Sequence, residues 1–217
     1  MITDPRVENY LYAMLPGRSA VLQEIEGQAK ERDIPIVGPA VGRLLYQYAR
    51  LISAKTVFEM GSAVGYSTIW WAMAVGDGGK VHFTDGSRKN ADEARKYFEQ
   101  AGVAHRIELH VGDALEVLSG RKEQFDILFC DIDKHDYPRA ARVAPQRVRR
   151  GGLFITDNTL WRGDVVYAAG NPDYKPENEP DRNISAIVAF NEIVYKSPDW
   201  FATIIPLRDG VTVAMRL

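Results

Sequence analysis

The stretch Lys55–Ser67, KTVFEMGSAVGYS, joins a short apolar run to a glycine turn and the start of a helical pattern. Val57–Met60 is apolar except for Glu59, and Gly61 and Gly65 follow it directly. A strand, a glycine turn and a helix in this order open the nucleotide pocket of an α/β sheet, because glycine lets the backbone approach a ligand closely. The stretch therefore predicts an α/β fold with a ligand pocket after its first strand. An ordinary strand-to-helix turn is the alternative interpretation.

The glycine spacing narrows the kind of ligand. The loop reads Gly-x-x-x-Gly and lacks the middle glycine that makes room for a pyrophosphate in the dinucleotide fingerprint. Its absence, with Glu59 just before the turn, favours a nucleoside without a pyrophosphate, and S-adenosylmethionine (SAM) is the commonest one. Asp85 lies about 20 residues beyond Gly65, where a carboxylate binds ribose in a βαβ unit. A helix cap before Ser87 is the alternative for Asp85, and Glu59 is expected either to hold the loop through backbone N–H groups or to contact the amino acid part of the ligand.

Strand-like and helical patterns alternate along the rest of the chain. Further strands are predicted at 81–84, 107–111, 125–130 and 153–156, and helices at 68–73, 90–100, 115–118 and 137–148, the last ended by Gly151-Gly152. Such alternation implies a parallel sheet with helices on both faces. The last two predicted strands, 201–205 and 211–215, are joined by five residues, which forces an antiparallel hairpin. The predicted fold is a Rossmann-like, doubly wound, seven-stranded and mostly parallel sheet with an antiparallel C-terminal hairpin strand.

The flanking segments are assigned around this sheet. Residues 1–217 are expected to form a single domain, because this length suits one α/β unit with additions. Residues 1–36 are an N-terminal helical appendage, with Thr3 or Asp4 capping a first helix that opens at Pro5 and with Ser19 beginning a second. A third helix is predicted from about 40 to 52. A helix is also predicted at 184–195. Residues 168–182 contain three prolines and many polar side chains, and are interpreted as a surface loop or lid.

Composition excludes several classes of partner. A net charge of −2 offers no general attraction to nucleic acid. No apolar run reaches membrane-spanning length, so no membrane association is expected. One cysteine, Cys130, rules out an internal disulfide and suits a reducing compartment; it lies in an apolar strand and is expected to be a buried packing residue. The N-terminus lacks the layout of a secretory signal, and a cytoplasmic location is predicted.

Acidic residues end four of the five predicted parallel strands: Glu59, Asp85, Asp131 and Asp157. If the strands before Asp131 and Asp157 are neighbours, their ends lie about 4.8 Å apart. Asp131, Asp157 and Asn158 then place three oxygen donors together, a set that suits Mg²⁺, Mn²⁺ or Ca²⁺. Without a cation the carboxylates would repel each other. The alternative is that Asp136 and Asp157 merely cap helices or turns.

Lys134 follows Asp131 by three residues, beside the expected ion. A divalent cation disfavours the ammonium form, which would let this lysine act as a general base for a hydroxyl. His135 is a competing base or a solvent-facing residue. The other histidines, His82, His105 and His110, are scattered along the chain and indicate structural roles.

Three segments together carry a family resemblance: EMGSAVGYS, FDILFCDIDKHDY and GGLFITDNTLWRGDV. From about Val37 to the C-terminus the chain resembles the cation-dependent O-methyltransferases related to catechol and caffeoyl-CoA O-methyltransferases. The resemblance implies a metal held by Asp131, Asp157 and Asn158, with Lys134 as the catalytic base. It implies substrate-side positions at Asp133 and Trp161, and usually a homodimer. The SAM-binding residues that it implies, with those of the glycine loop, are Val37, Glu59, Gly61, Ala63, Gly65, Ser67, Asp85, Ala114 and Asp131.

The resulting hypothesis is a SAM-dependent, divalent-metal-dependent transfer of a methyl group to a hydroxyl of a catechol-like small molecule, with Mg²⁺ as the expected metal. The cation lowers the pKa of the attacking hydroxyl and Lys134 removes its proton. Two rivals remain: an NAD-dependent dehydrogenase, disfavoured by the glycine spacing and the terminal hairpin, and a non-catalytic SAM-binding subunit. The acceptor, the native metal and the pathway are not predicted.

Overall fold

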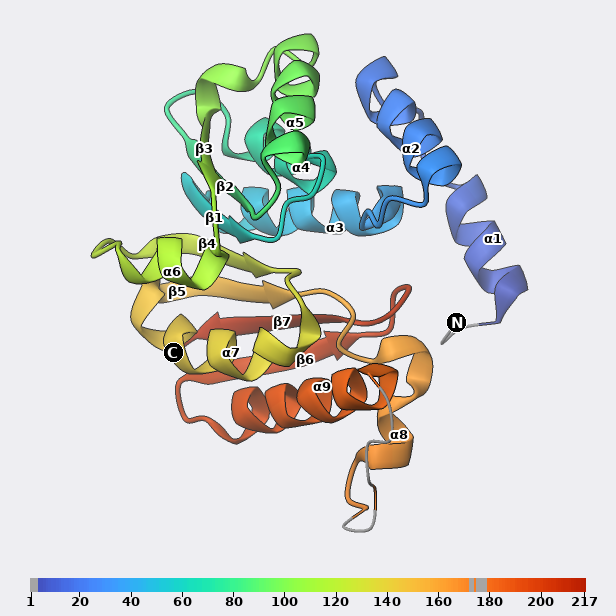
Figure 1. Ribbon diagram of the computed structural model, residues 1–217, viewed down its shortest axis with the longest axis vertical. Helices are drawn as coiled ribbons and strands as arrows, with labels where there is room; N and C mark the ends of the chain where they lie inside the picture. The colour runs from blue at the N-terminus through green and yellow to red at the C-terminus, as the bar shows by residue number, and fades with distance from the viewer. Residues whose placement is uncertain (1–3, 172–173, 175–178) are drawn as a thin grey trace. The chain divides into compact units, whose positions relative to one another are not determined.

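The computed structural model describes residues 4–171, 174 and 179–217. The chain, which Figure 1 colours by residue number, divides into two compact units. The N-terminal unit comprises Glu8–Lys122, and the C-terminal unit comprises Glu123–Leu217 together with the first residues up to Val7. The prediction of a single domain stays a prediction, and each unit is described by itself.

Three parallel strands form the sheet of the N-terminal unit, in the order β3-β2-β1. They are β1 (Thr56–Met60), β2 (Lys80–Asp85) and β3 (Ile107–Val111). Parallel neighbours need crossover connections, and these are supplied by α4 (Tyr66–Val75) and by α5 (Arg88–Gln100) with the 3₁₀ turn η1 (Ala104–Arg106). The helix α6 (Ala114–Ser119) follows β3. The expected β-α-β order is confirmed here.

Three helices precede β1: α1 (Pro5–Ala13), α2 (Ala20–Arg32) and α3 (Gly38–Leu51). Helix α2 begins next to Ser19 as predicted, and the Ser19 hydroxyl caps it by accepting from the N–H of Leu22. The apolar residues that α2 buries are Leu22, Ile25 and Ala29. No residue of α1 in the described part of the chain is buried. The start of α3 falls earlier than expected because Pro39 is accommodated in its first turn, where a missing N–H costs nothing.

Within its described residues, the C-terminal unit holds four strands in the order β4-β5-β7-β6. Strands β4 (Phe125–Cys130) and β5 (Val148–Thr156) are parallel, whereas β7 (Val211–Arg216) is antiparallel to both β5 and β6 (Trp200–Ile205). The expected C-terminal hairpin is confirmed, and with it the fold class of a mostly parallel sheet of seven strands. The helical elements of this unit are η2 (Lys134–Asp136), α7 (Tyr137–Arg147), η3 (Trp161–Gly163), α8 (Val165–Ala168) and α9 (Glu179–Lys196).

Gly151-Gly152 was expected to end the helix before β5, and this was wrong. Helix α7 ends at Arg147 and the glycines lie inside β5. The β4–β5 register shifts there, because Phe125 pairs with Val148 while Ile127 pairs with Leu153. Gly151 has φ 73°, and a Cβ on Gly152 would come within 2.7 Å of a backbone carbonyl oxygen, so only glycine fits this irregular ladder.

The predicted loop 168–182 is only partly a loop. Helix α9 begins at Glu179, five residues before the predicted start at Ile184, so residues 179–182 are helical. Residues 172–173 and 175–178 lie outside the part of the chain that the structure describes. No helix within the described residues is long and apolar enough to cross a bilayer.

Candidate functional site

The glycine loop of the N-terminal unit connects β1 to α4. Gly61 and Gly65 have φ of 79° and 84°, a region that favours glycine, and Ala63 between them is held at φ 45°. The N–H of Gly65 donates to the carbonyl of Ser62 at 2.8 Å, which closes the turn. The loop thus leads into the N-terminus of α4, and the first N–H groups of a helix, which have no partner within the helix, suit an anionic or polar ligand.

Asp85, at the end of β2, organises this loop. Its Oδ2 accepts from the N–H of Ala63 at 2.9 Å, and its Oδ1 accepts from the N–H of Ser87 at 2.8 Å and from the side-chain amide of Asn90 at 3.1 Å. The N-cap of α5 is Ser87, whose hydroxyl accepts from the N–H of Asn90. Asp85 therefore binds residues of the cap but is not the N-cap itself. Its predicted contact with a ribose stays a prediction, and its contact with the loop adds a second task.

Glu59 is fully buried at the end of β1. Its Oε2 accepts a short hydrogen bond from the hydroxyl of Thr68 in α4, and its carbonyl accepts from the Thr84 hydroxyl at 2.7 Å. Glu59 thus ties β1 to the following helix through a side-chain hydroxyl, where a backbone N–H partner was one expectation. The other predicted SAM contacts in this unit are buried at helix starts, namely Ser67 in α4, Val37 at the N-cap of α3 and Ala114 opening α6.

Replacing Gly65 with alanine is expected to destabilise the protein and weaken SAM binding. A Cβ at Gly65 would lie 2.5 Å from the ring of Phe98, which is 1% exposed and packs edge-on against Phe83. The ring therefore cannot move without disturbing its own packing. Overpacking destabilises the fold by about 1–3 kcal/mol, in addition to the backbone strain of a positive φ. Melting temperature and calorimetric SAM affinity measure the effect. Gly76→Ala is the matched control, since Gly76 has φ 64° with no atom near its Cβ position; equal losses in both variants would contradict the crowding argument.

The acidic cluster of the C-terminal unit lies where β4 and β5 end. Cys130 and Thr156 are paired in register, so Asp131 and Asp157 leave the two neighbouring parallel strands at the same point. The N–H of Asp157 donates to the carbonyl of Cys130 at 3.2 Å, which continues the ladder by one residue. The expected juxtaposition of these strand ends is confirmed. Cys130 itself is fully buried, and burial raises the pKa of its thiol to about 12.

Asp157 is the most perturbed carboxyl of the cluster. It is 2% exposed, and burial, followed by the charge of Asp131, raises its pKa from its ordinary value of 3.8. The N–H of Asn158 donates to its Oδ1 at 2.8 Å and offsets part of this. A buried carboxylate held beside a second one is an oxygen donor set that fits a hard divalent cation, because the ion would relieve both the burial and the repulsion.

Asn158 adopts φ 58°, a conformation that asparagine tolerates better than most residues. Its side-chain amide, oriented by its contacts, donates to Oδ2 of Asp209 at 3.4 Å. The two residues after Asn158 are held by the turn before β7. The N–H of Thr159 donates to the carbonyl of Gly210 at 2.9 Å, and the N–H of Leu160 donates to the carbonyl of Asp209 at 2.8 Å. The sequence analysis did not predict a role for Asp209, because only the folded hairpin brings it beside Asn158.

Lys134 is held directly against the cluster. Its ammonium donates to Oδ1 of Asp131 at 3.0 Å, to the carbonyl of Ile132 at 3.2 Å and to the hydroxyl of Tyr137 at 2.9 Å. The Tyr137 hydroxyl in turn donates to the carbonyl of Asp157 at 2.9 Å. The lysine side chain is 12% exposed. Tyr137, which burial keeps protonated by raising its pKa well above the ordinary value, is a second residue that the sequence interpretation missed.

Three other predicted residues lie around the cluster. His135 is 68% exposed and pairs with Asp136 at 3.3 Å, which favours its solvent-facing role over that of a base. Asp133 is exposed, and its carbonyl accepts from the N–H of Asp136 at 3.0 Å. Trp161 lies in η3 with φ 44°, and its N–H donates to the carbonyl of Asp209 at 3.2 Å. The substrate contacts of Asp133 and Trp161 stay predictions.

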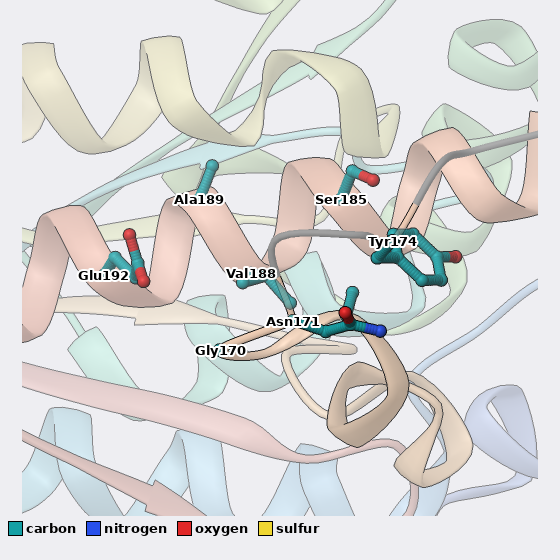
Figure 2. A pocket seen from close by; sticks show the side chains of 8 residues that line it. Gly170, Asn171, Tyr174, Ser185, Val188, Ala189 and Glu192 are labelled. Carbon is teal, nitrogen blue, oxygen red and sulfur yellow. The ribbon is translucent and has the colours of Figure 1, made fainter.

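A cavity of about 480 Å³ opens in the C-terminal unit between the segment after α8 and the side of α9 (Figure 2). It adjoins the expected lid, and none of its lining residues was among the predicted site residues. They are Ala168, Gly170, Asn171, Tyr174, Ser185, Val188, Ala189 and Glu192.

The comparison with protein families gives one family for nearly the whole chain. Residues 18–217 match the family model described as O-methyltransferase. Among curated proteins, the chain is 34% identical to tricin synthase 1 of Oryza sativa subsp. japonica in an alignment of 185 residues that covers 81% of this chain and 72% of that protein. It is 33% identical to caffeoyl-CoA O-methyltransferase 5 of Nicotiana tabacum, over 81% of this chain and 75% of the relative.

O-methyltransferases are also found among the solved structures that are similar to this chain. An O-methyltransferase from Bacillus cereus in complex with SAH is similar with a TM-score of 0.84 and 28% identity, over 98% of this chain and 97% of that one. The O-methyltransferase TomG from Streptomyces achromogenes in complex with SAM is similar with a TM-score of 0.84 and 31% identity, over 97% and 96% of the two chains.

Proposed function

The chain belongs to the O-methyltransferase family, and from that premise we propose that it transfers the methyl group of SAM to a hydroxyl of a vicinal dihydroxy aromatic molecule in a divalent-metal-dependent reaction. SAM-dependent O-methyl transfer follows from the family and its relatives. The NAD-dependent dehydrogenase is set aside by the same match. The metal, its identity as Mg²⁺ and the catechol-like acceptor are the proposed part.

The observation that carries the proposal is the pair Asp131 and Asp157 with Lys134 bound against it. Asp131, Asp157 and Asn158 would hold the cation through oxygen atoms. A divalent cation, when bound there, would acidify a coordinated hydroxyl and orient its neighbour. A purely structural cluster would not need a buried carboxyl with a raised pKa, which costs stability in the absence of a ligand.

Lys134 is proposed to remove the proton of the acceptor hydroxyl. Its ammonium contacts Asp131 after β4 and the hydroxyl of Tyr137 at the start of α7, so its position is fixed by groups from two elements. Tyr137 is proposed as a positioning residue that links Lys134 to the backbone of Asp157. Asp133 and Trp161 are proposed to contact the acceptor, with Trp161 as a wall for its ring.

SAM is proposed to bind the glycine loop of the N-terminal unit. Gly61, Ala63 and Gly65 would offer backbone to the ligand, and Asp85 would bind its ribose while it holds the loop at Ala63. Glu59 and Ser67, with Val37 and Ala114, are proposed to complete the contacts. SAM supplies the electrophilic methyl group, so the task of these residues is to hold it at a fixed place and exclude water.

The acceptor class rests on the relatives. The relatives are named caffeoyl-CoA O-methyltransferase and tricin synthase, and the aromatic caffeoyl group and tricin in these names support an aromatic hydroxyl acceptor. We also propose a homodimer in the cytoplasm that binds neither nucleic acid nor membrane; the net charge of −2 supports the absence of a nucleic-acid partner.

Chelation by EDTA is expected to reduce methyl transfer to background, and Mg²⁺ alone is expected to restore it. The measurement is SAH formation with catechols, hydroxycinnamoyl thioesters and flavonoids, with and without Mg²⁺. SAM affinity by calorimetry is the control and should survive chelation, because the proposed SAM residues apart from Asp131 are not metal ligands. A full rate in EDTA would contradict the metal dependence and leave the acidic cluster with a structural role alone. SAM binding without transfer to any of these acceptors would support the non-catalytic subunit.

A further inference from the structure

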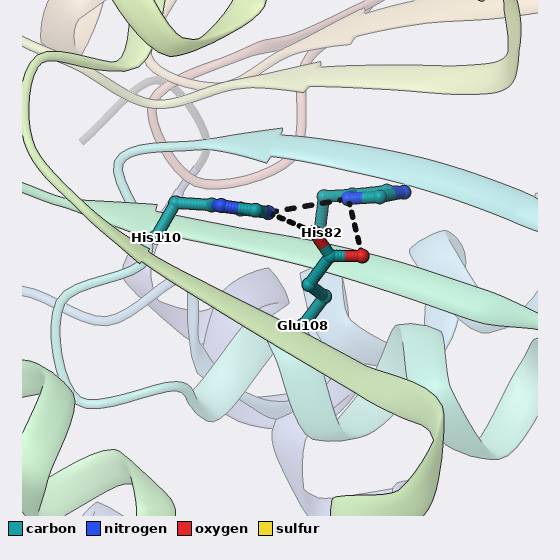
Figure 3. A group of neighbouring side chains, drawn as sticks. All are labelled: His82, Glu108 and His110. Atoms are coloured by element: carbon teal, nitrogen blue, oxygen red, sulfur yellow. Dashed lines mark hydrogen bonds and ion pairs between the residues drawn. The ribbon is translucent and has the colours of Figure 1, made fainter.

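A second group of candidate metal ligands lies in the N-terminal unit, on strands β2 and β3 (Figure 3). His82 is paired in register with Glu108 across the parallel ladder, and His110 follows Glu108 by two residues on the same strand. Side chains alternate along a strand with a period of two, so these three side chains project from one face of the sheet. The fold thus collects two of the histidines that are scattered in the sequence.

The three side chains meet at the spacing of metal ligands. His82 Nδ1 lies 3.3 Å from His110 Nε2 and 3.6 Å from Glu108 Oε2, and His110 Nε2 lies 3.2 Å from Glu108 Oε1. A tetrahedral zinc ion with bonds of about 2.0–2.1 Å separates its ligand atoms by about 3.3 Å. The observed separations match that edge, so an ion would require only small movements of the ligands.

The cluster is buried at His82 and exposed to solvent at Glu108. The His82 side chain is 8% exposed, and its ring stacks between the rings of Phe58 and His110, with centroids 5.9 and 5.5 Å apart. The Glu108 side chain is 45% exposed and offers an ion a route from solvent.

A cationic group already lies among these atoms. Nη2 of Arg121 is 2.8 Å from Oε1 of Glu108 and 3.0 Å from Nε2 of His110. The guanidinium therefore occupies a place where positive charge is stabilised by one carboxylate and one imidazole. It is a stand-in for a cation, and the Arg121 side chain, 24% exposed, would have to move aside for one.

We propose that His82, Glu108 and His110 form a binding site for a zinc-type transition metal ion, with a water molecule as the fourth ligand. Two imidazoles and one carboxylate suit Zn²⁺, Co²⁺ or Ni²⁺, whereas Mg²⁺ prefers oxygen ligands alone. The site differs in donor chemistry from the oxygen cluster that ends β4 and β5. A bound ion would tie β2 to β3, and so support the strand whose last residue, Asp85, holds the glycine loop.

Cobalt titration of the full chain in excess Mg²⁺ tests the proposal. One Co²⁺ per chain is expected, with the visible absorption of a tetrahedral site, and Zn²⁺ should displace it. His110→Gln and Glu108→Gln are each expected to weaken Co²⁺ binding by ~10–100-fold or more. His105→Gln is the matched control, since His105 is exposed outside the cluster, and it should bind as the original chain does. Absence of the absorption, or unchanged binding in both cluster variants, would overturn the site.

Arg121→Gln provides a test of opposite sign. Removal of the competing cation is expected to tighten Co²⁺ binding, by about tenfold for about 1.4 kcal/mol of relieved repulsion. Weaker binding in this variant would overturn the assignment of Arg121 as a stand-in and the site with it. Melting curves accompany each variant: Zn²⁺ should raise the melting temperature of the original chain but not that of Glu108→Gln. The Glu108 side chain is 45% exposed, so this variant is expected to fold, and its melting curve without metal checks this.

Discussion

Asp157→Asn is expected to slow methyl transfer strongly and, in the metal-free protein at pH 8, to raise the melting temperature. Burial and the charge of Asp131 raise the pKa of Asp157, so the folded state binds this proton more tightly than the unfolded chain does. The stability from this group is complete below its ordinary pKa and is lost as the pH rises through the raised value. At pH 8 the ionised carboxylate therefore costs stability, which the neutral amide avoids.

The geometry favours this outcome because the amide preserves the local contact. An asparagine Oδ1 can still accept from the N–H of Asn158, and the carbonyl of residue 157 still accepts from Tyr137. The gain is expected to be on the order of 1–3 kcal/mol, and a chain of this size melts about 2–4 °C higher per kcal/mol. The transfer rate should fall ~100-fold or more, since a proposed ligand of the cation is lost.

Thermal melts in EDTA at pH 5 and pH 8 measure the effect, which should be larger at pH 8. Mg²⁺ should stabilise the original chain and not the variant, because binding to the folded state raises its stability. Asp164→Asn is the control, a partly exposed carboxylate of the same unit that has no part in the cluster. A variant that melts lower than the original chain at pH 8, with normal activity, would show that Asp157 is a structural cap.

The meeting of Asp131 and Asp157 could be predicted from the sequence because it follows from a general property of sheets. Parallel strands that are neighbours end at the same edge, so residues after two such strands converge whatever lies between them. The contact of Asp85 with the N–H of Ala63 was not predicted, since the sequence analysis gave Asp85 a ribose contact or a helix cap. No such rule predicts the contact between Asn158 and Asp209, because this contact depends on how the turn before β7 folds back.

Local irregularities explain the errors in the predicted boundaries. Gly151-Gly152 has the composition of a helix end, and only the shifted pairing of β5 with β4 reveals that the glycines lie in a strand. The histidines were missed as a group for a related reason. His82 and His110 come together only once the register of β2 with β3 is known, and a single residue of slip would point one of them to the opposite face.

Replacing Lys134 with alanine is expected to lower kcat by ~10²–10⁴-fold while leaving SAM affinity unchanged, because a general base contributes about this much. The side chain donates three hydrogen bonds, to Asp131, to the carbonyl of Ile132 and to Tyr137, so its position is fixed before any acceptor binds. Single-turnover rates with a saturating acceptor measure the chemical step, and calorimetry measures SAM binding.

Lys134→Arg separates a base from a mere positive charge. Arginine retains the charge beside Asp131 but does not give up its proton at working pH, so it is expected to be nearly as slow as alanine. Tyr137→Phe keeps the buried ring and removes only the hydroxyl between Lys134 and the carbonyl of Asp157, and a smaller loss, about tenfold, is expected in kcat. Lys196→Ala, at a lysine that is 74% exposed, should change neither rate nor affinity. Full activity in Lys134→Arg would remove proton transfer from the role of this residue and leave only its charge.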